Sequence, residues 1–516
     1  MMKKKIMAML CCAMTLCFTA TALFGCGLST EKVDNTPGVV NIVMMEAGYG
    51  TEFMDKWIED FKKIPGNEDI KFTVKKDVQS TETATNALLD GDKNPYDLCF
   101  TGDIWYKKYV DKGQLADISD VVAGFDNPLR SELNDIITYK EKQWIVPWAY
   151  DPCGLIYNTD LLPEDKVPVT TDELLALVAD IADGKIESAK NVKPFVWAGD
   201  NAAAYWQYVT DVWWAQYEYL DSEYETGIDA YNNFWSLNDT DPDGYTVYQQ
   251  PGLEKSYEVL QALFAKKTWH MNGSETKKHT DAQTDFLLGR AVMFPCGGWL
   301  ENEMKEHYSD KKNYKMMKTP VISALGKELR LAGENATDAE HEKKLIAVVK
   351  AADAGKNAET IATELGVEKS KAEIIIAARN LTACIGVNHQ AWIPSTTNAL
   401  ENAKKFLTYM GSDAAARIFR EYSNSTLPFA YKTLKLTAST PFQESMDALH
   451  DSCEFLFPQM LATPMRYKAG LQKFTNSPDV EKKIWAGELT AKSFVKGEYD
   501  YLTGKDGKWN SYYNQI

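Results

Sequence analysis

Short apolar runs and amphipathic stretches alternate between residues 39 and 100. Residues 39–44 are rich in β-branched side chains and lie between turn-forming residues, which predicts a buried strand. A helix is predicted over 53–61 because apolar residues recur there at helical spacing, namely Phe53, Trp57, Ile58 and Phe61. The segments that follow predict a strand, the end of a helix and another strand, at 70–74, 86–89 and 96–100.

This order of elements predicts a βαβ series with a parallel sheet and right-handed crossovers. Ligands of such open sheets bind beyond the carboxyl ends of the strands. In this chain those ends are 46–49 and 101–105. The candidate side chains there are Glu46, Tyr49, Asp103 and Trp105.

A second series of elements follows Pro147. The pattern predicts strands over 154–158 and 194–197, separated by a helix over 171–181 with Thr171 as its N-cap. The next segment, 202–219, carries seven aromatic residues at helical spacing, which we expect not to face one core together. Residues 327–379 are rich in Ala, Glu and Lys with helical periodicity, which predicts an inserted helical subdomain.

Size and charge narrow the class of protein. The chain has 516 residues, 45% hydrophobic and 25% charged, so we expect two or three globular domains. Lys and Arg number 56 against 73 Asp and Glu, a formal net charge of -17. The electric field of this negative charge repels phosphate backbones and anionic headgroups, so we expect no nucleic-acid partner. The stretch 362–378 vaguely suggests a helix-turn-helix, but the acidic charge favours a solvated helix pair.

The first 26 residues have the organisation of an export signal. Lysines at 3–5 precede an apolar stretch over 6–24, and Leu23-Phe24-Gly25-Cys26 resembles a bacterial lipobox, in which the cysteine is lipidated after cleavage. We therefore expect a signal peptide over 1–25, a tether over 26–37, and a lipid anchor on Cys26 that holds the protein on the outer face of the cytoplasmic membrane. The alternative is an ordinary signal peptide in which Cys26 is incidental.

Cysteine and acidic residues give little support for a metal site. Apart from Cys26, five cysteines lie beyond the signal, scattered without a C-x-x-C pair, which predicts mostly buried free thiols: Cys99, Cys153, Cys296, Cys384 and Cys453. One weak calcium candidate resembles the first half of an EF-hand loop, with Asp239, Asp241 and Asp243 followed by Gly244. Gln250 at the twelfth position cannot supply the usual carboxylate, so an acidic surface turn is the alternative. We expect no cofactor.

Three motifs resemble those of one bacterial family. Residues 145–163 contain the run LIYNTDLLP, residues 286–299 read FLLGRAVMFPCGGW, and residues 403–407 read AKKFL. In this order they resemble the bacterial extracellular solute-binding proteins of family 1, the maltose-binding-protein-like receptors of ABC sugar importers. Together with the signal and the lipobox, the resemblance covers nearly the whole mature chain except the insertion at 327–379.

The resemblance implies an α/β fold with two lobes of the type II periplasmic-binding-protein kind. The lobes would be discontinuous, with a cleft at the hinge and an inserted helical subdomain. The implied boundaries are 38–150 with 286–325 for lobe 1, 326–384 for the insertion, and 151–285 with 385–516 for lobe 2. The chain would cross between the lobes near 150–154, 281–285 and 386–395.

The same resemblance implies a receptor and not an enzyme. We expect a monomer that captures a carbohydrate, an oligosaccharide, and delivers it to the permease subunits of an ABC transporter. Two alternatives stay open: a secreted glycoside hydrolase that uses paired carboxylates, and a receptor for a solute other than a sugar.

A sugar offers ring faces that lie well against aromatic side chains and hydroxyl groups that pair with carboxylates and amides. By the family's pattern, Asp151 is implied as the ligand-binding carboxylate, with Trp148 and Tyr150 beside it. Trp299 is implied as a stacking residue, and Tyr205 or Trp206 as an aromatic residue of the second lobe.

Other candidates are less clearly placed by the resemblance. The family's aromatic residue after the third strand is replaced here by Thr101, so Trp105 or Asp103 is the expected substitute. Asp151 could instead be a turn residue and Trp299 a core residue. Trp197 and Trp392 fit a site or a core equally well.

Overall fold

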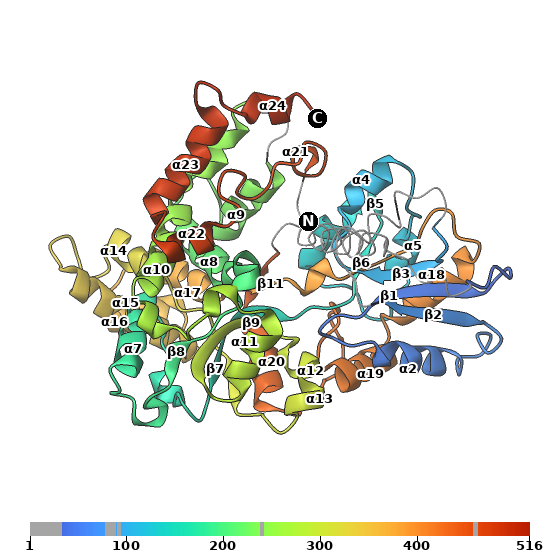
Figure 1. The fold of residues 1–516 in the computed structure, drawn as a ribbon, viewed down its shortest axis with the longest axis horizontal. Coiled ribbons are helices and arrows are strands. Elements are labelled where there is room, and N and C mark those ends of the chain that lie inside the picture. Colours follow the sequence, from blue (N-terminus) through green and yellow to red (C-terminus); the bar gives the residue numbers. More distant parts are fainter. Residues whose placement is uncertain (1–32, 78–88, 90–93, 238–241, 458–462) are drawn as a thin grey trace, which may run out of the picture.

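The computed structural model describes residues 33–77, 89, 94–237, 242–457 and 463–516. It shows two α/β lobes that lie side by side and are joined across one end (Figure 1). Each lobe has its own hydrophobic core. Cys26, Asp239 and Asp241 lie outside the described residues, as does most of the helix expected to end at 86–89.

Lobe 1 consists of the described residues among 33–150 and 386–436. Its sheet has the strand order β2-β1-β3-β12-β6. β1 pairs in parallel with β2 and β3, which confirms the predicted βαβ arrangement, and β12 runs antiparallel to β3 and β6. Its elements are β1 Val40–Met45, α2 Glu52–Phe61, β2 Phe72–Asp77, β3 Leu98–Thr101, α4 Tyr106–Asp111, α5 Ser119–Ala123, α6 Asn134–Ile137, β4 Thr138–Tyr139, β5 Lys142–Gln143, β6 Val146–Pro147, β12 Gln390–Trp392, α18 Leu400–Tyr409 and α19 Asp413–Ser423.

Lobe 2 consists of the described residues among 151–385 and 437–516. Its sheet has the order β13-β11-β7-β9-β8, with β10 also paired to β7. The elements of its first half are β7 Pro152–Asn158, α7 Thr171–Ala182, β8 Lys193–Phe195, α8 Ala202–Glu218, α9 Gly227–Ser236, α10 Pro251–Phe264, α11 His279–Leu287, β9 Ala291–Gly297, α12 Leu300–Glu303, α13 Lys305–Tyr308 and β10 Tyr314–Met316. Those of its second half are α14 Ser323–Glu328, α15 Asp338–Asp353, α16 Ala358–Leu365, α17 Lys369–Arg379, β11 Leu381–Cys384, α20 Pro441–Ser452, β13 Glu454–Leu456, α21 Pro464–Tyr467, α22 Val480–Ala486, α23 Ala491–Thr503 and α24 Trp509–Tyr513.

Two of the expected lobe boundaries are wrong. The motif at 286–299 was assigned to lobe 1, but β9 pairs antiparallel with β7 and parallel with β8, inside the sheet of lobe 2. Residues from 385 onward were assigned to lobe 2, but β12 completes the sheet of lobe 1. The helices α18 and α19 lie beside β1, β2 and α2, as the orange and blue ribbons in Figure 1 show.

The chain crosses between the lobes at three places. The first joins β6 to β7 at 148–151 and the second joins β11 to β12 at 385–389, as expected. The third joins α19 to α20 near 424–440; the expected crossing at 281–285 lies within α11 of lobe 2 instead. Backbone hydrogen bonds tie these segments together, since Tyr150 N donates to Thr426 O at 2.9 Å and Trp148 N donates to His389 O at 2.9 Å.

From Tyr205 to its end at Glu218, every residue of the helix α8 is buried. Its aromatic residues, expected not to share one core, all lie in the core of lobe 2, where Trp206, Trp213 and Trp214 are fully buried. α8 packs against β7, β9 and β11 and also against α9, α10 and α17, so only its first turn, where Ala203 is exposed, meets solvent. The N-cap of α7 differs by one residue from the expectation: Thr170 accepts a hydrogen bond from Glu173 N.

The expected helical insertion consists of α15, α16 and α17. A capping box at Thr337 starts α15, and Asn357 caps α16. The apolar faces of these helices belong to the core of lobe 2 itself, through Leu345, Val348 and Ile375. The insertion is therefore an extension of lobe 2 and has no separate core.

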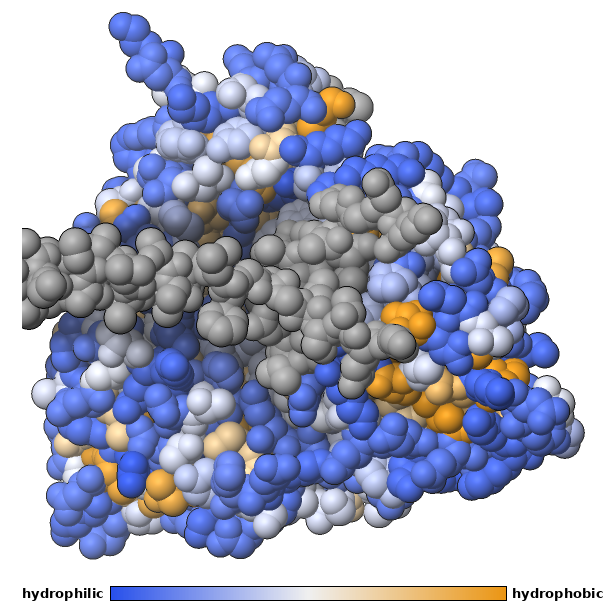
Figure 2. Space-filling model, turned by 45° about the vertical axis from the view of Figure 1, so that its right-hand side comes forward, coloured by the Kyte–Doolittle hydropathy of each residue, from blue (hydrophilic) through white to orange (hydrophobic). Residues whose placement is uncertain are grey.

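The surface in Figure 2 is mainly hydrophilic, with small separate hydrophobic areas. None of the helices in the described part of the chain is long and apolar enough to cross a membrane.

Candidate ligand-binding site

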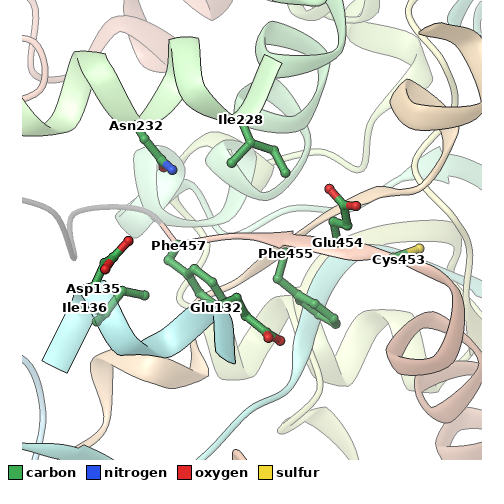
Figure 3. Close-up of a pocket in the computed structure, with 9 residues that line it drawn as sticks. All are labelled: Glu132, Asp135, Ile136, Ile228, Asn232, Cys453, Glu454, Phe455 and Phe457. Carbon is green, nitrogen blue, oxygen red and sulfur yellow. The ribbon is translucent and has the colours of Figure 1, made fainter. Parts of the chain in front are cut away.

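A pocket of about 440 Å³ lies between the two lobes, near their hinge (Figure 3). Lobe 1 supplies one wall, α9 of lobe 2 supplies the opposite wall, and the segment around β13 runs between them. The lining residues are Glu132, Asp135, Ile136, Ile228, Asn232, Cys453, Glu454, Phe455 and Phe457. A pocket of this size is large enough for a small organic ligand.

The wall from lobe 1 is a short helical turn fixed by its apolar side. Leu133, Ile136 and Ile137 are buried in the core of lobe 1. Glu132, directly before Leu133, and Asp135, directly before Ile136, are exposed and line the pocket. The turn is also held at its end, because the Tyr106 hydroxyl donates to Ile136 O at 2.7 Å.

The opposite wall is one face of α9. A capping box fixes the start of this helix, with the Thr226 side chain accepting from Asp229 N and the Asp229 side chain accepting from Thr226 N. Ile228 and Asn232 are four residues apart, so they lie on the same face of the helix and both line the pocket.

The strand β13 contributes to both cores. It pairs in parallel with β11, and Leu456 is buried in the core of lobe 2. Because side chains alternate along a strand, Phe455 and Phe457 point the other way and pack in the core of lobe 1. Their rings lie 5.0 Å and 6.2 Å from the ring of Tyr150. This alternation places two aromatic rings between the lobes.

Tyr150 connects the hinge to the pocket. Its hydroxyl donates to Glu132 Oε1 at 2.6 Å, which fixes the orientation of this pocket carboxylate. Burial raises the pKa of Tyr150, so the hydroxyl remains a donor. The guanidinium carbon of Arg130 lies 5.0 Å from the centre of the Tyr150 ring, and His450 stacks on the ring at 5.3 Å.

The pocket combines apolar rings with hydrogen-bonding groups. Three carboxylates and one amide face it, and no Lys or Arg is among its described lining residues. Carboxylates accept hydrogen bonds from hydroxyl groups, and these charge-assisted bonds are about twice as strong as neutral ones. Together with the aromatic rings, they suit a polyhydroxylated ligand.

Asp151 lies in the first crossing and is almost completely buried. Burial raises its pKa to about 6, while the hydrogen bond from Ser425 Oγ at 2.6 Å and the charge of Arg420 act in the opposite direction. Asp151 is not among the residues that line the pocket between the lobes. In this conformation it connects the first crossing to the third.

Trp299 is wedged between the lobes. A Cβ atom on Gly48 of lobe 1 would lie 2.8 Å from Trp299 Cβ, and one on Gly297 of lobe 2 would lie 2.1 Å from Trp299 Cζ3. The ring makes edge contacts with Tyr49 of lobe 1 at 6.3 Å and with Tyr208 of lobe 2 at 6.0 Å. Trp299 is half-buried and packs against both cores.

Most of the other expected aromatic residues lie in one core or the other. Tyr49, Trp148 and Trp392 are buried in lobe 1, and the indole nitrogen of Trp392 donates to Thr101 Oγ1 at 2.8 Å. The buried aromatic residues in lobe 2 are Trp197, Tyr205 and Trp206.

Three expected residues remain partly or fully accessible. Glu46 is exposed. Asp103 and Trp105 are half-buried, and Asp103 accepts a hydrogen bond from Trp105 N at 3.0 Å. The ring of Trp105 lies 6.4 Å from that of Tyr467 in lobe 2, so Trp105 reaches across between the lobes.

The residues that line the pocket were not predicted as a site. They come from three segments separated by about a hundred residues or more, and none of those segments carries a ligand-binding motif of its own. The one local signal is the run Glu454-Phe455-Leu456-Phe457, whose alternation is typical of a strand with two aromatic residues on one face.

No group of three or more His, Cys, Asp or Glu side chains is arranged to hold a metal ion in the part of the chain that the structure describes. Of the calcium candidate, only Asp243 is described, and it accepts a hydrogen bond from the Tyr245 hydroxyl at 2.9 Å. The five cysteines in the described part of the chain are free thiols, four of them buried.

The model of the family of bacterial extracellular solute-binding proteins matches residues 47–417. The chain belongs to this family. The match covers most of lobe 1 and the whole helical extension of lobe 2. A solute-binding protein of this family is a binding protein that acts outside the cell, and a pocket between two lobes is consistent with that role.

Solved structures with the same fold include sugar-binding proteins. One is the GacH receptor of Streptomyces glaucescens, solved with and without acarbose. It matches with a TM-score of 0.58 at 14% sequence identity, and the match covers 93% of this chain and 100% of that one. A chitin oligosaccharide binding protein gives a TM-score of 0.59 at 14% identity, with 90% and 98% covered. RafE in complex with raffinose gives a TM-score of 0.58 at 17% identity, and the match covers 90% of this chain and 98% of that one. These similarities establish the two-lobed α/β fold.

Proposed function

We propose that this solute-binding protein captures a carbohydrate, an oligosaccharide, in the pocket between its lobes and delivers it to the permease subunits of an ABC importer. The observation that carries the proposal is the composition of that pocket, in which Phe455 and Phe457 lie beside carboxylates and an amide from both lobes. The structural neighbours named for raffinose, chitin oligosaccharide and acarbose support the same class of ligand.

Binding works through the hinge. A ligand that touches Asp135 of lobe 1 and Asn232 of lobe 2 interacts with both lobes only when they are close together. It therefore shifts the population toward the closed form by its difference in affinity for the two forms. The closed form is then the one that the permease recognises, and no bond in the ligand is broken.

A panel of neutral mono- and oligosaccharides tests the proposal by thermal shift, since a ligand raises stability by RT ln(1 + [L]/Kd). For a sugar that binds, Asp135→Ala and Asn232→Ala should each weaken binding about tenfold or more by calorimetry, because each removes a hydrogen-bonding group from one wall. Asp165→Ala and Asn510→Ala change exposed residues of the same types elsewhere and should leave binding unchanged.

The same samples test the alternative of a glycoside hydrolase. After long incubation with the bound oligosaccharide, chromatography should recover it intact and in stoichiometric amount. Cleavage products would contradict the receptor function. If no sugar binds and another class of solute does, the carbohydrate part of the proposal is wrong.

We also propose that Cys26 carries the lipid that anchors the protein at the cell surface. The lipobox-like sequence before Cys26 supports this. Full-length protein expressed in a bacterial host should partition into the detergent phase, whereas Cys26→Ala should move to the aqueous phase. Equal partitioning of the two would rule out the anchor.

A further inference from the structure

A second pocket lies where α19 of lobe 1 meets the segment that leads into α20 of lobe 2. It has a volume of about 360 Å³ and shares no lining residue with the pocket between the lobes. Its lining residues are Arg417, Arg420, Glu421, Asn424, Lys435, Leu436, Thr437, Ser439 and Gln443. The third crossing of the chain therefore forms one side of this pocket.

Positive charge is concentrated there. Arg417, Arg420 and Lys435 line the pocket together with a single carboxylate, that of Glu421, although the whole chain has a net charge of -17. Arg417 and Lys435 are exposed, and neither has an ion-pair partner within 4.0 Å among the described residues. Three cations beside one carboxylate give the hollow a positive local charge, which attracts an anion.

Arg420 adds a buried cation with unused donors. It is only 7% exposed, and its Nη2 donates to Asp447 Oδ1 of lobe 2 at 2.5 Å. Its Nε and Nη1 are buried without a hydrogen-bond partner in the part of the chain that is described. A buried donor without an acceptor costs stability, so an acceptor at this position would be favoured.

The remaining polar groups form a fixed wall. Gln443 Nε2 donates to Asn424 Oδ1 at 2.9 Å, and Gln443 Oε1 accepts from Ser439 N at 2.8 Å. The side chain of Thr437 is exposed at the same pocket. Hydroxyl and amide groups beside cations are the usual partners of a tetrahedral oxyanion.

We propose that this pocket binds a small oxyanion of the phosphate or sulfate type, free in solution. Arginine presents planar pairs of N–H donors that match such anions, and lysine adds a compact charge. The bound anion would connect α19 of lobe 1 to the segment 435–439 at the hinge. This site does not depend on the solute that binds between the lobes.

In the test, the whole protein is titrated with inorganic phosphate and binding is measured by calorimetry. The thermal shift in phosphate is also compared with that in chloride at equal ionic strength. The key variant is the double substitution Arg417→Ala with Lys435→Ala, since both side chains are exposed and neither has an ion-pair partner that supports the fold. The matched control is Lys492→Ala with Lys505→Ala, which removes two exposed cations from lobe 2. The control is needed because phosphate stabilises many proteins without binding to a site.

Wild type and control should bind phosphate saturably, with about one equivalent at the endpoint, and the Arg417/Lys435 variant should bind it about tenfold more weakly or worse. Equal phosphate responses in the two double variants would overturn the proposal. So would a result in which only vesicles of phosphatidylglycerol, and not free phosphate, distinguish the two variants, because the site would then bind a lipid surface.

Discussion

Asp151 is a carboxyl group placed where ionisation is unfavourable. It is buried in the first crossing, and a single hydroxyl, that of Ser425, donates to one of its oxygens at 2.6 Å. Its other oxygen, Oδ1, has no hydrogen-bond partner among the described residues. The charge of Arg420 offsets part of the cost, but desolvation dominates and the pKa rises to about 6.

This pKa gives Asp151 a pH-dependent effect on stability. Its folded-state pKa of about 6 exceeds the ordinary value of 3.8, so between these values the folded chain holds more protons than the unfolded chain. Stability from this group therefore falls as pH rises through this range, by about 3 kcal/mol in total. Asp151→Asn keeps a polar partner for Ser425 and removes the charge.

The stability of Asp151→Asn relative to wild type should therefore improve from about pH 4 to about pH 7 and then level off. Denaturant unfolding at a series of pH values measures this difference. Asp165→Asn, an exposed substitution of the same kind, serves as the control. A wild-type-to-variant difference that does not change with pH would show that Asp151 ionises normally.

At the scale of elements, α15 is integrated into the core of lobe 2. Leu345 is fully buried, and a Cβ atom on Gly326 of α14 would lie 3.1 Å from the Leu345 Cβ atom. Leu345→Ala should lower the free energy of unfolding by about 2–5 kcal/mol, because it leaves a cavity in a close-packed core. Lys343→Ala, an exposed change on the same helix, should cost less than about 0.5 kcal/mol.

Denaturant unfolding of the two variants measures this difference. If Leu345→Ala is as stable as Lys343→Ala, α15 is a dispensable appendage. The prediction of helices in this region, α15 to α17, is confirmed, because local periodicity and capping residues such as Thr337 and Asn357 determine them. What they pack against was not predictable, because that depends on contacts with distant residues.

The same distinction explains α8. The spacing of its aromatic residues predicts a helix, and that prediction is confirmed. The expectation that some of them would leave the core is wrong, because it assumes that a helix buries only one face. α8 is enclosed by strands on one side and by helices on the others.

At the scale of the whole molecule, the pairing of strands into sheets shows which lobe each segment belongs to, and local sequence patterns do not determine that pairing. Motifs over 145–163 and 286–299 predict the family and its two-lobed fold, and the family match confirms them. They do not determine which sheet β9 joins, since its strand partners are separated from it by about a hundred residues or more. The pocket was missed for the same reason, as its walls meet only in the folded chain.

The lobes are close together in this structure on both sides of the pocket. Trp299 joins them near the hinge, while farther away the Trp105 ring of lobe 1 lies 6.4 Å from the Tyr467 ring of lobe 2. Lys468 Nζ lies 3.9 Å from Asp111 Oδ2 in the same region. This exposed ion pair contributes little, whereas the aromatic contact brings two large rings together across the lobes.

Tyr467→Ala should therefore shift the population toward an open form. The radius of gyration of the unliganded protein, measured by small-angle X-ray scattering, should increase relative to wild type. The apparent affinity for the transported solute should fall about threefold or more, because a smaller fraction of molecules has both walls of the pocket in place. Tyr308→Ala alters a half-buried tyrosine on α13, at the opposite end of the lobes from α21 (Figure 1), and should change neither quantity. If Tyr467→Ala scatters like wild type and binds the solute equally well, the contact between Trp105 and Tyr467 does not hold the lobes together.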